Sequence, residues 1–306
     1  LKSRPTRLED AQAAAAIGQI KLAEAFGALF ASADIAVAQV LLTLQDLEDR
    51  GRYLNARNTL DALVDKGIIP IVNENDTVAT EEIRFGDNDR LAARVAQLVK
   101  ADATVLLSDV DGLYTEDPNQ HSDAEMLKTV DAITPDIEAM AGPAKSGSVG
   151  TGGMATKIDA AKIATAAGCA LIITNGTGDH PLKAFSESRR GTLFTASAEP
   201  LAVRKAWIRG MMSPSGFLHI DGGAEAALKR GASLLPAGVT SIDGSFIRGD
   251  LVALMNASGK VIGQGLSGYS DEEAALMAGH KSEEATERLG YTVRHVMVHR
   301  DDLILF

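Results

Sequence analysis

The chain has 306 residues, of which 45% are hydrophobic and 23% are charged, and its formal charge at pH 7 is −11. This length and composition indicate one large or two modest folded domains and exclude wholesale disorder, while a single cysteine, Cys169, excludes a disulfide framework and indicates a reducing, cytoplasmic compartment. We find no signal peptide and no apolar run near the roughly 18–20 residues of a membrane helix, so no membrane partner is expected, and the acidic balance argues against a protein that mainly binds nucleic acid.

Apolar runs alternate with helical patterns from Leu1 to about Thr195. Helices are expected over Leu8–Phe30, Leu54–Asp65, Arg90–Lys100 and Ala155–Ala167, and strands over Ile35–Leu42, Ile68–Val72, Thr104–Leu107 and Ala170–Thr174. Strands this uniformly apolar are buried on both faces, and their alternation with helices predicts an α/β domain with a mostly parallel sheet sandwiched by helices. Ligands of such sheets bind beyond the carboxyl ends of the strands, so candidate residues are sought there.

The pattern changes after Pro200. Short Gly-rich segments that alternate in polarity occur at Phe217–Ile220, Ser241–Asn256 and Val261–Gly265, and only Ala224–Arg230 and Glu272–Gly279 have a helical pattern. Turn signals at this spacing predict a small antiparallel barrel or sandwich. We place the boundary between residues 196 and 214, which gives a first domain over 1–205 and a second, β-rich domain over 214–306.

The stretch Asn73–Asp89 begins where a predicted strand ends, and it gathers carboxylates and amides ahead of a helix. Short acidic and amide side chains also suit turns and helix caps, so an ordinary solvated loop stays open as an alternative. The functional alternative is a site for a small zwitterion, whose ammonium group needs acceptors and whose carboxylates need donors. The candidate residues of that site are Asn73, Asp76, Asp87 and Asn88.

Two further motifs follow other strands. Ser108 and Asp109 end the strand Thr104–Leu107, where a hydroxyl and a carboxylate can contact a nucleotide or simply form a turn. Gly147–Lys157, a Gly-rich loop that enters a helix, offers backbone N–H groups and an ammonium group to an anion, although a flexible loop with a helix cap would look the same. The Walker pattern is absent, and a GxGxxA match in this loop lacks the preceding strand and the later acidic residue of a dinucleotide site.

The histidines and the single cysteine give little evidence of a further functional site. His295 and His299 lie in a segment with a strand pattern, and no carboxylate is spaced to complete a metal site with them, so no metal site is expected. Cys169 precedes a buried strand and is expected to be a small core residue. No local signature of a serine or cysteine hydrolase is present.

Taken in order, the segments NENDTVAT…GDND, SDVDGLYTEDP and GTGGMATK resemble the glutamate 5-kinases, a branch of the amino-acid kinase family. The similarity runs through the whole chain, and RGASLLPAGVTSIDGSFIRGD resembles the C-terminal PUA domain of these enzymes. The resemblance implies ATP-dependent phosphorylation, with Mg²⁺, of the side-chain carboxylate of L-glutamate. The product would be γ-glutamyl phosphate, the first intermediate of proline biosynthesis. The family is typically homo-oligomeric and is inhibited by proline.

The resemblance also implies roles for residues of this sequence. Glutamate would be held by the four residues of the zwitterion site given above. ATP would be held by Ser108, Asp109, Thr151, Gly152, Gly153, Met154, Ala155, Thr156 and Lys157. Lys157 would neutralise charge on the transferring phosphoryl group, and Asp89 would orient the lysines of the site. Because a carboxylate nucleophile is already ionised, catalysis reduces to alignment and charge stabilisation.

Two departures from the family pattern matter. Arg84 stands where some relatives carry lysine. The positive charge is kept, but a planar guanidinium group replaces the compact ammonium group. The family also begins with a strand, a Gly-rich loop bearing a lysine and a later Ser-Gly-Ala turn, none of which precedes Leu1 in this sequence. About two βα units, roughly 60 residues, are therefore expected to be missing. We expect an incomplete sheet, half of a phosphate site and impaired turnover from the chain as given.

Two alternatives stay open for the function. The first is another amino-acid kinase, acting on acetylglutamate or aspartate, although the PUA-like segment and the NENDTVAT loop favour glutamate. The second is an RNA-binding PUA module. Eight Lys/Arg and twelve Asp/Glu lie between Ser213 and Phe306, which is not the basic footprint of an RNA reader. We therefore expect the second domain to have an interaction or regulatory role, with nucleic acid an unlikely partner.

Overall fold

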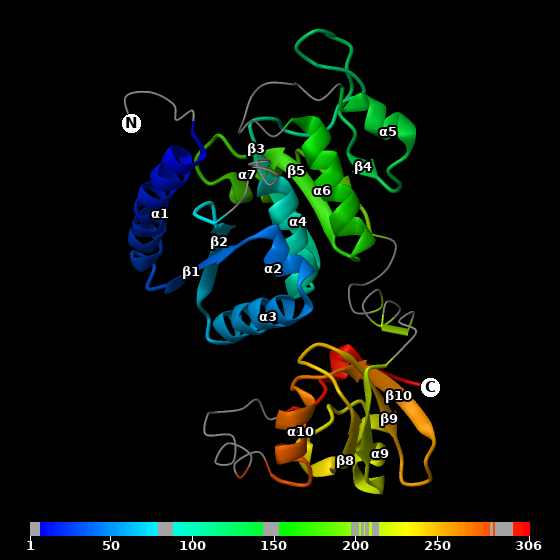
Figure 1. Ribbon diagram of the computed structural model, residues 1–306. Coiled ribbons are helices and arrows are strands. Elements are labelled where there is room, and N and C mark those ends of the chain that lie inside the picture. Colours follow the sequence, from blue (N-terminus) through cyan, green and yellow to red (C-terminus); the bar gives the residue numbers. More distant parts are fainter. Residues whose placement is uncertain are drawn as a thin grey trace. The chain divides into compact units, whose positions relative to one another are not determined.

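The computed structural model describes residues 7–78, 88–142, 153–196, 202, 205, 208, 209, 214–281, 284 and 296–306 (Figure 1). The chain divides into two compact units, Leu1–Pro200 and Leu201–Phe306, and each is described by itself. The predicted domain limits, 1–205 and 214–306, remain our proposal for the biological boundary.

The first unit alternates helices with strands. Its helices are α1 (Leu8–Ala31), α2 (Leu44–Glu48), α3 (Arg50–Asp65), α4 (Asn88–Val99), α5 (Pro135–Met140), α6 (Met154–Ala166) and α7 (Pro181–Ser188), and its strands are β1 (Val37–Leu42), β2 (Ile69–Glu74), β3 (Ala103–Ser108), β4 (Thr129–Val130), β5 (Ala170–Asn175) and β6 (Thr192–Phe194). Every helix and strand predicted up to Thr195 is present, with ends shifted by a few residues at most. An α/β architecture is therefore confirmed.

The strands of the first unit form two sheets among the described residues. Strands β1 and β2 pair in parallel, and a second sheet has the order β3-β5-β6-β4. In the second sheet β3 and β5 are parallel, as are β4 and β6, while β5 and β6 are antiparallel. The sheet is thus mostly parallel, as predicted. The expected gap in the sheet stays a prediction.

Local hydrogen bonding explains where two of these elements begin and end. Helix α3 starts at Arg50, four residues before the predicted start, because the Asp49 side chain caps it by accepting from Arg52 N at 2.8 Å. Strand β2 continues to Glu74 because its parallel register with β1 runs that far, pairing Leu41 with Asn73. The predicted loop residue Asn73 is therefore part of a strand.

Helices α4 and α6 pack against each other and cover strands β3 and β5 (Figure 1). Three of the buried residues of α6 are small, since Ala160, Ala161 and Ala164 have no exposed surface. Small side chains let a helix approach a sheet closely and leave no void behind. Cys169 is 1% exposed beside this helix, which confirms its predicted role as a core residue.

Helix α1 is the exception to this close packing. None of its described residues is buried. By length and composition alone it is apolar enough to cross a membrane, which qualifies the expectation that no apolar run approaches that length. A core helix or a signal sequence satisfies the same criterion, so this is weak evidence.

The second unit is β-rich, as predicted. Its elements are β7 (Gly216–Ile220), α9 (Gly222–Lys229), a 3-10 turn (Pro236–Gly238), β8 (Val239–Gly244), β9 (Leu251–Met255), β10 (Val261–Leu266), α10 (Asp271–Met277), a second 3-10 turn (Arg300–Asp302) and β11 (Leu303–Leu305). The strand order is β11-β10-β9-β7-β8, with every pair antiparallel except β7 and β9. The core between sheet and helices centres on Leu218, Leu254 and Tyr269.

Two details of the second unit differ from or refine the prediction. His299 caps the second 3-10 turn by accepting from Asp301 N at 3.3 Å, so the predicted strand around it stops at an isolated bridge between Leu234 and Val298. His295 lies outside the described residues. Gly265 on β10 is required for close approach, since a Cβ there would lie 2.7 Å from the Asp302 carbonyl oxygen.

A buried threonine ties the loop after β3 to the sheet and gives a test of the fold. Thr192 Oγ1 donates to Leu127 O at 2.6 Å and accepts from Leu113 N at 2.8 Å, and the residue is 0% exposed. Thr192→Val should lower the free energy of unfolding by about 1–3 kcal/mol, because two buried backbone groups lose their partner. Urea denaturation followed by circular dichroism measures this loss.

The matched control for that test is Thr195→Val, whose hydroxyl bonds only the half-exposed Asp131 side chain at 3.0 Å. We expect a change within about 0.5 kcal/mol there. Equal losses in the two variants would contradict the assigned role of Thr192.

Candidate functional site

A nearly buried ion pair joins α4 to α6. Lys157 Nζ donates to Asp89 Oδ2 at 2.9 Å, and the two side chains are 7% and 18% exposed. An ammonium group removed from water to this extent needs a counter-charge, and Asp89 provides it. The two predicted catalytic residues, 68 positions apart in the sequence, therefore lie in direct contact.

Thr156 adds a second link to the same carboxylate. Its Oγ1 lies 3.2 Å from Asp89 Oδ2 and 2.7 Å from Gly153 O. Gly153 is the N-cap of α6 and, having no side chain, leaves the first N–H groups of the helix without a side-chain cap. No acidic residue lies in the first turn of α6. The start of α6 thus presents uncapped N–H groups and the positive end of a helix dipole, which together suit an anion.

Residues predicted to bind a zwitterion lie at the end of β2 and the start of α4, two elements that pack together. Asn73 Nδ2 donates to Gln19 Oε1 of α1 at 2.8 Å, so its amide already has a partner in this structure. Asp76 is exposed just after β2, and Asn88 is exposed as the first residue of α4. No hydrogen bond among the described residues links these three to Asp89 or Lys157.

Two carboxyl groups near the end of β2 resist ionisation. Partial desolvation raises the pKa of Asp76. Desolvation and the neighbouring charge of Asp76 raise the pKa of Glu74. Two adjacent carboxylates that have no cationic partner among the described residues form a site that a ligand ammonium group would stabilise. Glu74 lies in the same predicted loop but was given no role there.

The carboxyl ends of β3 and β5 meet side by side. Ser108 pairs with Asn175 in the parallel register, and Gly176 N donates to Ser108 O at 2.7 Å. A Cβ on Gly176 would lie 2.7 Å from Leu107 Cβ, so only glycine allows this approach. Ser108 Oγ donates to Asp109 Oδ1 at 3.0 Å, which makes the predicted pair one hydrogen-bonded unit. Asn175, which the sequence analysis passed over, is a further polar group at this edge.

The loop that leaves β3 is held by an ion pair. Arg190 Nε donates to Asp111 Oδ2 at 2.6 Å, and Tyr114 Oη donates to Asp111 Oδ1 at 3.1 Å. Partial burial alone would raise the pKa of Asp111, but the hydrogen bonds from Arg190 and Tyr114 lower it overall. The segment after Asp109 is therefore fixed to the start of β6 rather than free in solvent.

Several predicted positions cannot be placed. Asp87, Thr151, Gly152 and Arg84 lie outside the described residues. Gly153, Met154 and Ala155 form the cap and first residues of α6, as a phosphate-binding helix start requires. The structure thus brings together Asp89, Thr156 and Lys157 in one group, and Ser108, Asp109 and Asn175 in another.

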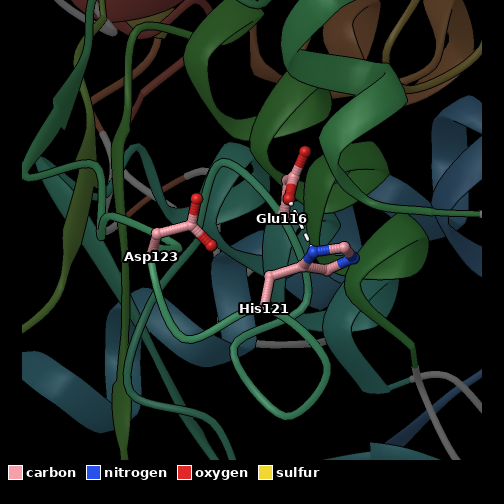
Figure 2. Close-up of side chains that lie close together, drawn as sticks. All are labelled: Glu116, His121 and Asp123. Carbon is pink, nitrogen blue, oxygen red and sulfur yellow. Dashed lines mark ion pairs between the residues drawn. The ribbon is translucent and has the colours of Figure 1, made fainter.

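One group of potential metal ligands occurs among the described residues, and Figure 2 shows it. Glu116, His121 and Asp123 turn toward one another, and His121 Nδ1 lies 3.1 Å from Glu116 Oε2. All three residues are exposed, and no buried ligand joins them in the part of the chain that is described. Exposed acidic groups beside a histidine are common on surfaces, so we assign this cluster no metal.

Comparison with known proteins places both units. A model described as "Amino acid kinase family" matches residues 1–175, and a PUA domain model matches residues 216–289. The chain is 54% identical over 305 residues to a glutamate 5-kinase from Agrobacterium fabrum, covering 100% of this chain and 78% of the relative. It is 56% identical over 299 residues to glutamate 5-kinase 1 from Rhizobium meliloti, covering 98% and 76%. A crystal structure of UMP kinase from Bacillus anthracis matches at 15% identity with a TM-score of 0.42, over 63% of this chain and 72% of that one.

The carboxyl groups after β2 give a pH-dependent prediction. Because the pKa of Asp76 is raised in the folded state, the folded protein holds a proton that the unfolded chain has lost. Stability should therefore fall as the pH rises from the ordinary value of 3.8 through the raised pKa. Asp76→Asn removes this titration and the charge beside Glu74. Urea midpoints measured between about pH 4 and 8 should show a smaller decline for the variant than for the unmodified protein.

Asp136→Asn, an exposed acidic residue in the first turn of α5, is the control for this measurement. It should follow the pH dependence of the unmodified protein. A decline in Asp76→Asn as steep as in the unmodified protein would show that Asp76 contributes nothing to it.

Proposed function

The chain belongs to the amino acid kinase family and, within it, to the glutamate 5-kinases, and from this premise we propose that it transfers the γ-phosphoryl group of ATP to the side-chain carboxylate of L-glutamate. The product is γ-glutamyl phosphate, which starts proline biosynthesis. One observation carries the proposal on the structural side: a nearly buried lysine, held by one carboxylate, lies one turn into a helix whose first N–H groups have no side-chain cap.

In this reaction the protein has mainly to align the two substrates and to stabilise the negative charge of the phosphoryl group. The glutamate carboxylate is ionised at neutral pH, so no general base has to activate it. The difficulty is to bring two anions together and to stabilise the charge that spreads over the transferring phosphoryl group. The ammonium group of Lys157 and the N–H groups of α6 supply positive charge for that purpose. They are fixed in advance by packing, so they need no reorganisation during the reaction.

Asp89 acts on Lys157 rather than on the substrate in this scheme. Its Oδ2 accepts from both Lys157 and Thr156, which holds the ammonium group in one position. Asp89 thereby fixes the distance between α4 and α6 at the point where phosphate would lie. We assign it the role of an orienting residue.

Glutamate binding is assigned to residues around the end of β2 and the start of α4. The carboxylate of Asp76 would accept from the substrate ammonium group, which would stabilise the charged carboxylate whose pKa partial desolvation raises. The amides of Asn73 and Asn88 would donate to substrate carboxylates, and Asp87 completes the set. Since Asn73 now donates to Gln19, substrate must compete with α1 for that amide.

ATP binding is assigned to two helix and strand ends. The γ- and β-phosphates would lie at the start of α6, against Thr151 through Lys157. Ser108 and Asp109, hydrogen-bonded to each other at the end of β3, would contact the nucleotide.

Mg²⁺ is proposed to enter with ATP rather than in a protein-held site. In the part of the chain that is described, Asp89 of α4 is the carboxylate that bonds the first turn of α6, and its Oδ2 already accepts from Lys157 and Thr156. These residues do not fit a magnesium cage made by the protein, so we assign the ion no protein ligand.

Some features of the family are carried over as proposals. We propose a homo-oligomeric cytoplasmic enzyme that proline inhibits near the glutamate site. The second unit, which belongs to the PUA domains by its sequence match, is assigned an interaction or regulatory role. The hydroxylamine assay described below distinguishes glutamate from the other candidate acceptors, acetylglutamate and aspartate.

Hydroxylamine trapping tests the reaction itself. An acyl phosphate reacts with hydroxylamine to a hydroxamate, which gives a coloured iron complex. We expect the full-length protein to form hydroxamate with ATP and glutamate, and little with aspartate or acetylglutamate. Absence of hydroxamate with glutamate would defeat the assignment.

Lys157→Ala tests the central residue. We expect turnover to fall by about two orders of magnitude or more, because a preorganised charge on the transition state is lost. Lys162→Ala is the control, since Lys162 lies on the same helix, bonds Glu138 at 2.8 Å and is 40% exposed. It should keep turnover within about twofold. Circular dichroism checks that both variants fold, and unchanged turnover in folded Lys157→Ala would remove the residue from catalysis.

A further inference from the structure

A pocket of about 460 Å³ lies in the second unit, and none of the residues assigned to the kinase reaction lines it. Its walls come from Lys205 and Arg209, the end of α9 and the chain from the second 3-10 turn into β11. The charged groups on its wall are Lys205, Arg209, Arg300 and Asp301, and its apolar surface includes Leu228 and Leu303.

The wall that carries Lys205 and Arg209 is anchored to the sheet of the same unit. Ile208 is 0% exposed and packs with Leu251, Leu266 and Ile304. Gln264 Nε2 donates to Ile208 O at 2.7 Å. Residues 205, 208 and 209 are helical, and helix residues four apart lie on the same face. Burial of Ile208 therefore holds Lys205 and Arg209 together on one side of the pocket.

The opposite wall is joined by backbone hydrogen bonds. Leu234 N donates to Val298 O at 2.9 Å, and Arg300 N donates to Ser233 Oγ at 3.0 Å. Helix α9 ends at the pocket with Gly231 in the left-handed conformation, φ 85°. The loop after α9 and the chain that carries Arg300 are thus fixed to each other, so the pocket is preformed.

Among the described residues, the cationic side chains of this pocket differ in their partners from two other cationic side chains of the unit. Lys229 pairs with Glu225 at 2.7 Å, and Arg248 donates to Gly268 O and lies over the Tyr269 ring. By contrast, Lys205 and Arg209 have no hydrogen bond or ion pair in the described residues, and the guanidinium of Arg300 has only Asp301, 3.9 Å away.

The pocket is also more positively charged than the unit as a whole. From Leu201 to Phe306 the sequence has eleven Lys/Arg and twelve Asp/Glu, a nearly balanced set. The pocket has three cations and one carboxylate. Like charges on one small concave surface repel one another, and a bound anion would relieve that repulsion.

We infer that this pocket binds a small organic anion with two or more negative charges and an apolar body. Lys205, Arg209 and Arg300 would bind the anionic groups, and the leucine surface would cover the carbon skeleton. Dicarboxylates and phosphate esters share this chemistry. The volume of the pocket suits one small molecule. A long polyanion would need a basic surface that extends beyond the pocket, and the nearly balanced charge of the unit does not supply such a surface.

Isothermal titration calorimetry of the full-length protein with isophthalate, a rigid dianion on an apolar ring, tests this inference. We expect saturable one-site binding that weakens as salt is raised, because the cations are partly exposed. Phenyl phosphate, in a second arm, tells whether phosphate esters or dicarboxylates bind better. The neutral isophthalamide should not bind, and a short single-stranded RNA should not compete.

Variants then locate the site. Replacing Lys205, Arg209 and Arg300 by Gln together should weaken isophthalate binding at least about tenfold. Lys229→Gln is the matched control, because it removes a cation from α9 outside the pocket lining, and it should leave binding unchanged. Equal affinity in the triple variant, equal binding of isophthalamide, no saturable binding of either anion, or tighter competition by RNA would each overturn the inference. Near-UV circular dichroism and thermal unfolding check that the triple variant folds, and hydroxamate formation with glutamate tests the kinase assignment separately.

Discussion

The requirement that Lys157 keep a counter-charge while almost removed from water organises the first unit. A buried ammonium group without a partner would lose its proton or unfold its surroundings, so Asp89 has to stay within hydrogen-bonding distance. Because the two residues lie on different helices, that need fixes α4 against α6. A second ion pair, Arg90 to Asp159 at 2.5 Å, joins the same helices one or two residues further on. The geometry of the proposed phosphate site and the packing of the two helices therefore depend on the same ion pair.

Most helices and strands of the first unit could be predicted from local sequence patterns. The elements that could not be predicted depend on contacts that a local pattern does not contain. Strands such as Ala103–Ser108 and Ala170–Asn175 are apolar runs bounded by helices, so their position was evident. Strands β4 and β6 have two and three residues, too few for any periodicity, and their pairing depends on partners far along the chain. The antiparallel β6 could not be foreseen for that reason. The exposure of α1 depends on what packs against it, which its own composition does not contain.

The candidate site was predictable only in part. Polar residues at strand ends marked Ser108 and Asp109, and the Gly-rich approach to a helix marked Lys157. The pairing of Lys157 with Asp89 came from the family resemblance, because nothing in a separation of 68 residues indicates a contact. Glu74 lies in the predicted loop Asn73–Asp89 but was given no role there, and Asn175 was passed over because it follows the predicted strand Ala170–Thr174 and belongs to no motif. Register with the neighbouring strand, not sequence spacing, brings Asn175 beside Ser108.

Helix α6 combines two roles on a single face. Lys157, Ala160, Ala161 and Ala164 are spaced three or four residues apart, so the lysine and the fully buried alanines share one stripe. A larger side chain at an alanine position would lift or tilt the helix as a rigid rod and carry the ammonium group away from the proposed phosphate position. Damage to the core of this unit would then appear first as a folded but inactive enzyme. The small residues on α6 thus hold the ammonium group in place as well as filling the core.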